Sequence, residues 1–294
     1  MSERIGVWAA ILSSTFGGMS AAVTRFVIAD ADPVTIAAFR FGGGVLFLLP
    51  LALAARSQWP KGRDWWGVAG LGLMFFAFFF ILYNTALAYT TASRGALALS
   101  VLPLATMVVA ALLRVETLTP RKTAGVLIAI GGVAVALAAG LATAPAGAWR
   151  GDAIMVAATL CMALYSVWSR PFIARSSALG FVTAGMAVGA ACLVLVGAVT
   201  GGFATVAHFK APQFLAVTYL GLFGGAAAFY LWVFALQRTT PTRVASTMTV
   251  NPIAASLLAA AIIGEPIGLP LLIGIVAVGT GIWVATTEPA RATT

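Results

Sequence analysis

The residues that could do chemistry in this chain are polar but uncharged, and several of them precede two prolines. Ser100 lies shortly before Pro103, and Thr247 and Asn251 lie shortly before Pro252. Thr247 and Asn251 are four residues apart, so they would share one face of a helix. Hydroxyl and amide groups can bind the ammonium and carboxylate of a zwitterion without carrying a charge themselves. We interpret these side chains as parts of a binding site, with helix–helix hydrogen bonds as the open alternative.

Aromatic residues could form the apolar wall of such a site. Tyr165 and Trp168 are three residues apart and would share a helix face, and Tyr230 lies close to Trp232. Rings would suit an apolar or aromatic ligand, although packing and lipid-facing roles are the alternatives. The candidate substrate-binding residues are Tyr83, Asn84, Ser100, Tyr165, Trp168, Tyr230, Trp232, Thr247 and Asn251.

Residues suited to catalysis or metal binding are scarce. The single histidine, His208, lies in a short polar gap, and Cys161 and Cys192 lie inside apolar runs. The sequence has no His-Glu-x-x-His motif and no spacing typical of a metal site or a disulfide framework. We therefore expect neither an enzyme nor a bound metal or cofactor.

The elements that position these residues must lie in an apolar environment. The chain has 294 residues, of which 61% are hydrophobic and 9% charged, and its mean hydropathy is +1.03. A soluble domain carries about 25% charged residues, because water must wet its surface. The net charge of +9 is spread in small groups between apolar runs, so it does not form the basic patch of a nucleic-acid-binding protein.

Ten apolar runs are long enough to cross a bilayer, which needs roughly 20 residues per helix. The runs are apolar on all sides, whereas barrel strands alternate, so we predict an all-α integral membrane protein. The expected spans are Ile5–Ala29, Val34–Ala55, Trp65–Ala88, Arg94–Leu113, Thr123–Ala142, Gly151–Arg170, Leu179–Thr200, Gln213–Leu236, Arg243–Ile263 and Ile267–Thr286.

The distribution of basic residues predicts the orientation. The loops that alternate with the spans differ in charge, and cytoplasmic loops carry the excess of Lys and Arg. The richer side would be cytoplasmic and would hold both termini, which requires an even number of spans. Its basic residues are Arg4, Arg56, Lys61, Arg63, Arg114, Arg121, Lys122, Arg170, Arg175, Arg238, Arg243 and Arg291, against Arg25, Arg94, Arg150 and Lys210 on the other side.

The two halves of the chain match each other at a constant offset of 149 residues. We therefore predict two five-helix repeats, residues 1–146 and 147–294. Because five is odd, the second repeat would be inverted relative to the first, which is a recurring transporter architecture. The matched pairs include Thr90 and Thr239, Thr91 and Thr240, Arg94 and Arg243, Pro103 and Pro252, and Glu116 and Glu265.

Pro103 and Pro252 occupy equivalent places near the middle of their spans. Proline removes a backbone hydrogen bond, and in lipid the freed carbonyl must face protein or a wet cavity. Breaks at equivalent places in two halves therefore indicate a binding site at the membrane midplane. We predict that the two prolines are hinges, with an ordinary helix kink as the alternative.

Two arginines lie inside the first two spans, where charges are rare. Arg25 is late in the first span, and Arg40 is six or seven residues into the second. We expect either side chain to reach the outer surface or to pair with Asp30 or Asp32. A gating ion pair is a further possibility.

Five motifs carry a resemblance to a known family: Arg40-Phe41, the segments Thr91–Pro103 and Thr240–Pro252, Glu116, and Glu265-Pro266. They resemble those of the drug/metabolite transporter superfamily, in particular its ten-helix EamA-type exporters. Within that superfamily the chain is similar to the YddG-like aromatic amino acid exporters. The resemblance implies export of aromatic and other neutral amino acids.

The residues also bear on the energy source. A proton-coupled carrier usually needs a titratable group within the membrane, and no acidic residue falls at mid-span here. We expect uniport by alternating access, in a bacterial inner membrane. The carrier would function as a monomer, and its partners would be a small-molecule substrate and the lipid bilayer. The alternative is a drug or metabolite exporter of the same superfamily coupled to the proton gradient.

Two other classes of membrane protein fit the sequence less well. A carrier of phosphorylated metabolites would need more Lys and Arg within the spans, and a structural scaffold would not need the repeat.

Overall fold

The computed structural model describes residues 2–113, 120–140 and 144–286, and all regular structure in these ranges is helical. Arg114, Glu116, Arg291 and the end of the fifth predicted span lie outside the described residues. The helices up to residue 140 are α1 (Ser2–Val27), α2 (Pro33–Ala54), α3 (Asp64–Gly72), η1 (Leu73–Phe79), α4 (Phe80–Tyr89), α5 (Ala92–Leu99), α6 (Leu102–Leu112) and α7 (Pro120–Ala139). The later helices are α8 (Ala148–Trp168), α9 (Arg170–Arg175), α10 (Ala178–Thr200), η3 (Gly202–His208), α11 (Ala211–Tyr219), η4 (Leu220–Ala227), α12 (Ala228–Leu236), α13 (Pro241–Ser246), η5 (Thr247–Thr249), α14 (Val250–Ile263) and α15 (Leu269–Thr286).

Eight continuous helical segments in the described residues are long and apolar enough to cross a membrane. They coincide with eight of the ten predicted spans. Two shorter apolar helices lie where the fifth and tenth spans were predicted. The eight segments are Arg4–Val27, Pro33–Ala54, Asp64–Tyr89, Ala92–Leu112, Ala148–Arg175, Ala178–Thr200, Ala211–Leu236 and Arg243–Ile263.

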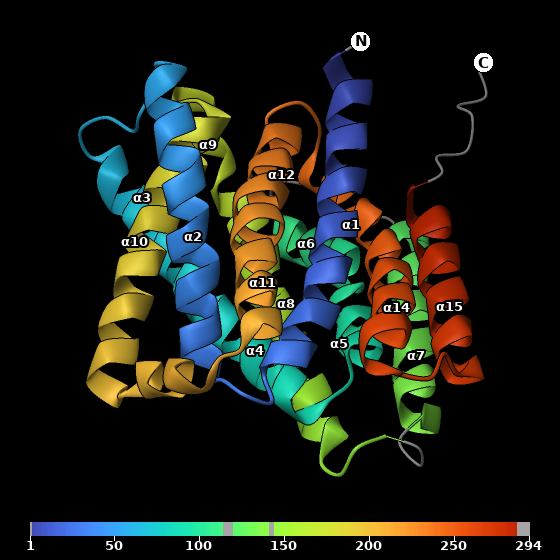
Figure 1. Ribbon diagram of the computed structural model, residues 1–294. Helices are drawn as coiled ribbons and strands as arrows, with labels where there is room; N and C mark the ends of the chain where they lie inside the picture. Colours follow the sequence, from blue (N-terminus) through green and yellow to red (C-terminus); the bar gives the residue numbers. More distant parts are fainter. Residues whose placement is uncertain (1, 114–119, 141–143, 287–294) are drawn as a thin grey trace, which may run out of the picture.

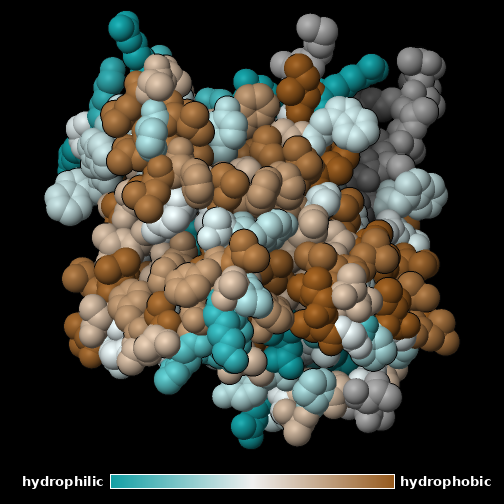
Figure 2. All heavy atoms as spheres, in the orientation of Figure 1, coloured by the Kyte–Doolittle hydropathy of each residue, from teal (hydrophilic) through white to brown (hydrophobic). Residues whose placement is uncertain are grey.

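The helices form one bundle whose long axes run roughly side by side (Figure 1). α2, α3 and α10 lie at one edge of the bundle, and α7 packs against α15 at the other. The outer surface is strongly apolar: Leu46 and Val199 are 75% and 88% exposed. Figure 2 shows hydrophobic residues over the middle of the visible face and hydrophilic ones towards its upper and lower ends. A surface of this kind is stable in lipid.

Glycines allow helices to approach closely at two places. A Cβ on Gly72 of α3 would collide with the backbone of Gly185 in α10. A Cβ on Gly43 of α2 would lie 3.3 Å from the Cα of Gly221 in η4. Small residues at such contacts increase van der Waals packing between membrane helices, which have no hydrophobic effect to drive their association.

Four local irregularities interrupt the long helices. The fourth span breaks between α5 and α6, and Pro103 lies in the first turn of α6. The ninth span passes through the 3₁₀ segment η5 before α14, with Pro252 in the first turn of α14. The segments η1 and η4, in the third and eighth spans, are π-helical. π-helical turns are rare and frequently mark functional sites.

Candidate functional site

A small cavity lies inside the bundle, where several helices meet. Its volume is about 40 Å³, which is room for roughly three water molecules. Sites for small molecules commonly occupy about 300 to 1,000 Å³, so this cavity is smaller than a typical ligand site. The lining residues are Ser13, Ser14, Gly17, Arg40, Phe79, Phe80, Tyr83, Leu99, Met162, Ala228, Phe229, Trp232, Met248 and Asn251.

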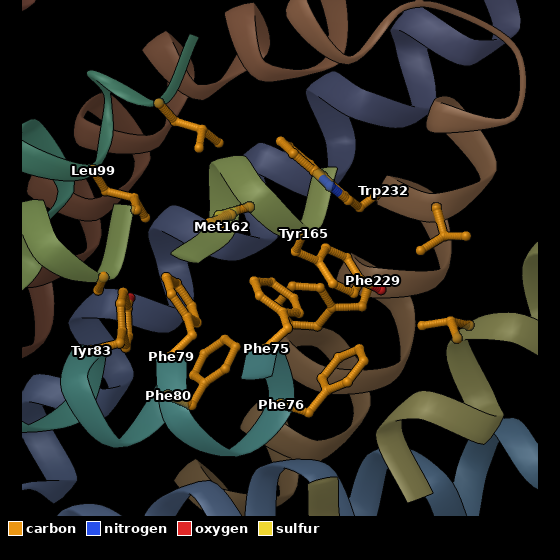
Figure 3. Packing of buried hydrophobic residues seen from close by; sticks show 14 of the residues in the cluster. Phe75, Phe76, Phe79, Phe80, Tyr83, Leu99, Met162, Tyr165, Phe229 and Trp232 are labelled. Carbon is orange, nitrogen blue, oxygen red and sulfur yellow. The ribbon is translucent and has the colours of Figure 1, made fainter. Parts of the chain in front are cut away.

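One side of the cavity is walled by aromatic rings (Figure 3). Phe79, Phe80 and Tyr83 come from η1 and α4, and Phe229 and Trp232 come from α12. The Phe80 and Phe229 rings meet edge to face with centroids 5.5 Å apart. Such a wall can contact an apolar side chain over a large area.

Arg40 is the charged residue of this lining. The side chain is buried, with 2% exposed, and its Nε and Nη2 both donate to the carbonyl oxygen of Gly224, at 3.0 and 2.8 Å. Its guanidinium carbon lies 4.7 Å from the centre of the Phe80 ring and 6.0 Å from that of Tyr83. It pairs with no carboxylate of the described residues. The expected pairing of Arg40 with Asp30 or Asp32, or its extension to the outer surface, therefore does not occur.

Three polar atoms around the cavity are buried without a hydrogen-bond partner. They are Nη1 of Arg40, Nε1 of Trp232 and Oδ1 of Asn251. All three residues line the cavity, and each is 1 to 2% exposed. A buried polar atom without a partner is costly, so such atoms mark places where a ligand or water supplies the missing bond.

The structure brings together four of the residues singled out in the sequence. The lining of the central cavity includes Tyr83, Trp232, Asn251 and Arg40. Thr247 lies directly behind it, because its hydroxyl is 2.8 Å from that of the lining residue Ser14.

The other candidates lie elsewhere. Asn84 donates to the carbonyl of Pro33, and Ser100 donates to that of Leu97. Tyr165 is stacked behind the aromatic wall with its ring 4.1 Å from that of Phe75. Trp168 and Tyr230 also lie away from the lining: Trp168 is 43% exposed at the surface, and Tyr230 packs on Phe234.

Sequence reasoning missed the contribution of the first helix. Ser13 and Ser14 of α1 line the cavity, and Ser13 donates to the carbonyl of Ala228 on α12. The signal was present in the sequence, since Ser13 and Ser14 are adjacent polar residues inside an apolar span.

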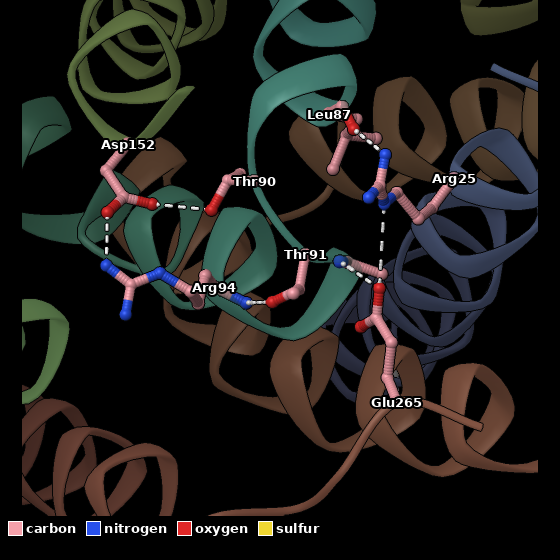
Figure 4. A network of polar contacts seen from close by, with 8 residues as sticks. Arg25, Leu87, Thr90, Thr91, Arg94, Asp152 and Glu265 are labelled. Carbon is pink, nitrogen blue, oxygen red and sulfur yellow. Dashed lines mark hydrogen bonds and ion pairs between the residues drawn. The ribbon is translucent and has the colours of Figure 1, made fainter. Parts of the chain in front are cut away.

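Two ion pairs connect helices near the ends of α1 and α14 and the starts of α5 and α8 (Figure 4). In the first ion pair, Nε of Arg25 in α1 lies 3.7 Å from Oε1 of Glu265, which follows α14. Arg25 also donates to the carbonyl of Leu87 in α4, and Glu265 accepts from the backbone N–H of Ala92 in α5. The expected pairing of Arg25 with Asp30 or Asp32 does not occur, because Asp32 caps α2 and Asp30 accepts from Gln213.

The second ion pair is between Arg94 of α5 and Asp152 of α8. The Nη2–Oδ2 distance is 2.5 Å, and both side chains are about nine-tenths buried. Thr90 donates to the other oxygen of Asp152, and Arg94 also donates to the carbonyl of Leu137 in α7. The two ion pairs together connect α1, α4, α5, α7, α8 and the turn after α14.

Burial shifts the pKa of Glu265, which lies outside the spanning segments. It raises the pKa of this carboxyl above the ordinary value of 4.5, against the opposing influence of the Ala92 and Ser93 backbone N–H groups and of Arg25. Glu265 is therefore protonated more readily than an exposed glutamate.

A second hollow lies beside this network, between α5, α7 and the start of α15. It has a volume of about 690 Å³ and is lined in part by Thr91, Arg94, Leu97 and Leu271. Within the described residues, no three His, Cys, Asp or Glu side chains come close enough to hold a metal ion.

Comparison with known proteins identifies the family. The model of the EamA-like transporter family matches residues 4–138 and again residues 149–287. The chain belongs to the EamA-like transporter family. It is therefore a multi-pass membrane transporter of the drug/metabolite transporter superfamily and not an enzyme.

Individual relatives agree with this assignment. The uncharacterized transporter YyaM of Bacillus subtilis is 24% identical over 92% of this chain and 90% of its own length. A protein of Streptantibioticus cattleyicolor named a "probable terminal-alkyne amino-acid exporter" is 29% identical, over 66% of this EamA transporter and 64% of its own length. A crystal structure with 22% identity superimposes with a TM-score of 0.69 over 97% of this chain and 96% of that one, which supports the fold.

Proposed function

We propose that this EamA transporter exports small organic solutes, and specifically neutral and aromatic amino acids, as the YddG-like exporters do. The observation that carries the proposal is the central cavity, which combines an aromatic wall with unpaired polar atoms. An amino acid needs both kinds of surface, because its backbone end is polar and its side chain is apolar. The relative named an amino-acid exporter lends further support.

The proposed architecture is ten spans in two inverted five-helix repeats, residues 1–146 and 147–294, with both termini in the cytoplasm. The family model matches once in each half. The breaks before α6 and within η5, and the π-helical segments η1 and η4, lie at nearly equivalent positions under the offset of 149 residues. In Figure 1 α1 begins and α15 ends at the upper side, whereas α8 begins at the lower side, as two opposed repeats would require.

We propose that Tyr83, Trp232 and Asn251 contact the substrate. Thr247 would act behind them through Ser14, and Tyr165 would support the aromatic wall. Asn84 and Ser100 would hold helices in place through their backbone hydrogen bonds, since each already donates to a carbonyl. Pro103 and Pro252 would be the hinges, because each lies in the first turn after a break.

The two ion pairs would close the outer gate in the described conformation. Arg25 keeps the gating role suggested by the sequence, with Glu265 as its partner and with Arg94 and Asp152 as a second lock. Opening to the outside would separate these pairs, and the two repeats would exchange conformations. We infer a bacterial inner membrane location and a monomeric carrier.

The charges of the cavity support the proposal of uniport. None of its lining residues, all within the described part of the chain, is acidic. A drug exporter driven by protons would need a carboxylate there, both to bind the proton and to attract a cationic substrate.

Transport by the purified protein in liposomes tests the proposal. A pool of the twenty amino acids, placed outside liposomes, should enter down its gradient, with aromatic and other neutral members fastest. An imposed pH gradient should leave the initial rates unchanged. Uptake of none of the twenty would refute the substrate assignment, and strong acceleration by the pH gradient would refute uniport.

A further inference from the structure

The cavity contains a positive charge for which the described protein provides no negative partner. Arg40 is the one charged residue among the lining residues, and it is buried. The guanidinium stays protonated under all ordinary conditions. A buried charge without a counter-ion is strongly unfavourable, so a partner supplied from outside would be bound tightly.

We propose that Arg40 binds the carboxylate of the transported molecule, with Trp232 as a second donor and Asn251 as the acceptor for its ammonium group. This inference rests on the proposed function and makes it more specific. It assigns Arg40 to substrate recognition instead of gating, and it makes a carboxylate a requirement for transport.

The unpaired atoms have the polarity that an α-amino acid requires. Arg40 Nη1 and Trp232 Nε1 are hydrogen-bond donors, and a carboxylate accepts such bonds at two oxygens. Asn251 Oδ1 is an acceptor, and an ammonium group donates. The three groups come from α2, α12 and α14, so a single amino acid bound among them would connect helices from both halves of the chain.

The guanidinium is held in one orientation by the surrounding structure. Nε and Nη2 share the carbonyl of Gly224, which belongs to the π-helical segment η4. The faces of aromatic rings, including that of Phe80, surround the same group. These contacts occupy one edge of the planar fork and leave Nη1 without a partner, as a preorganised carboxylate receptor would require.

The arrangement also argues against cationic drugs as substrates. A cation in the cavity would be repelled by Arg40, and no lining residue offers a carboxylate to offset this repulsion. Phosphorylated metabolites are disfavoured as well, because the lining contains a single cation for two negative charges.

Matched acids and amides test the proposal directly. The full chain in liposomes is offered the twenty amino acids and their α-amides as one pool. The pH is about 6.5 on both sides of the membrane, so that the α-amines are charged. Uptake is read by mass spectrometry. We expect each transported acid to enter at least about tenfold faster than its amide, which is the loss that a missing charged hydrogen bond causes.

Variants then assign the discrimination to residues. Arg40→Gln should lower uptake of the acids by about 10- to 100-fold and remove the preference over amides. Arg40→Lys keeps the charge and should restore part of the preference. If Arg40→Gln does not fold, Trp232→Phe keeps the ring and should lower the acid-to-amide ratio by about 3- to 10-fold. Arg175→Gln, which breaks an ion pair at the surface, is the control and should keep the wild-type ratio.

Each outcome decides one point. Equal uptake of acids and amides would overturn the inference and leave the proposed transport of amino acids standing. An unchanged ratio in Arg40→Gln and Trp232→Phe would also overturn it. Uptake of neither class would overturn the proposed function and this inference together. Rapid uptake of 3-phenylpropionate, which lacks the ammonium group, would support the role of Arg40 and contradict that of Asn251.

Discussion

Replacing Asp152 by Asn should unlock the proposed outer gate. The substitution keeps the shape of the side chain, and its amide oxygen can still accept from Thr90. It removes the charge opposite Arg94, whose Nη2 lies 2.5 Å from the carboxylate. In the closed conformation Arg94 would then be a buried cation without its carboxylate, although it would still donate to the carbonyl of Leu137.

The size of the effect follows from the burial of this pair. Breaking a buried ion pair by removing one partner costs about 3 to 5 kcal/mol. The Arg94 and Asp152 side chains are 11% and 10% exposed, so we take the lower end, about 3 kcal/mol. If the pair exists only while the gate is closed, this cost shifts the equilibrium towards the open state by about 150-fold.

Thiol labelling from outside the cell measures the shift. Ser13→Cys places a thiol on the cavity wall, in a background where Cys161 and Cys192 are replaced by Ala. A membrane-impermeant thiol reagent should modify this cysteine slowly in the Asp152 parent. Asp152→Asn should raise the labelling rate by about 10- to 150-fold, up to the limit set by the fully open state.

Two controls test whether the charge is the cause. Arg175→Gln removes an exposed ion pair with Asp64, so the labelling rate should not change. The double variant with Arg94→Met and Asp152→Leu removes both charges, and it should label more slowly than Asp152→Asn. An unchanged rate in Asp152→Asn, or an equal increase with Arg175→Gln, would refute the assignment of this pair as a lock.

Three further predictions use other parts of the structure. Gly72→Ala should lower the stability of the detergent-solubilised protein by about 1 to 3 kcal/mol, because the new Cβ would collide with the backbone of Gly185. Gly70→Ala is the matched control: its Cβ would have no neighbouring atom within 4 Å, so the substitution should be neutral or stabilising. Because burial raises the pKa of Glu265, its contribution to stability is present below pH 4.5 and is lost as the pH rises through the raised pKa. The melting temperature of the wild type should therefore fall over that pH range, and that of Glu265→Gln should fall less. Parallel melting profiles of the two proteins would contradict this. Trp168→Ala should leave the rate of amino acid transport unchanged, since the Trp168 side chain lies at the surface. Tyr83→Ala should lower that rate by about tenfold, because Tyr83 lines the cavity. A larger loss of transport in Trp168→Ala than in Tyr83→Ala would place the site elsewhere.

The helices could be predicted from the sequence because each depends on a local property, the length of an apolar run. The break before Pro103 could be predicted for a similar reason, since proline removes a backbone donor at a known position. The π-helical segments could not be predicted, because Leu73–Phe79 and Leu220–Ala227 contain no residue that demands the wider turn. Their geometry depends on packing between helices that are far apart in the sequence.

The site could be predicted only in part for the same reason. Tyr83, Trp232 and Asn251 have types that suit a binding site, but so do Tyr165 and Trp168, and the rotation of each helix decides which side chains reach the cavity. Proximity in the sequence points to Asp30 or Asp32 as the partner of Arg25, because sequence alone does not show which helices are neighbours. Glu265 is its partner because α1 and α14 lie side by side in the bundle.

The most direct test of the account is an experimental structure of the protein bound to an amino acid that it transports. The account predicts that the amino acid lies in the cavity between α2, α12 and α14, with its carboxylate within hydrogen-bonding distance of Arg40 Nη1. Density for the amino acid in the hollow beside Arg94 and Leu271, or a bound molecule whose carboxylate points away from Arg40, would contradict it.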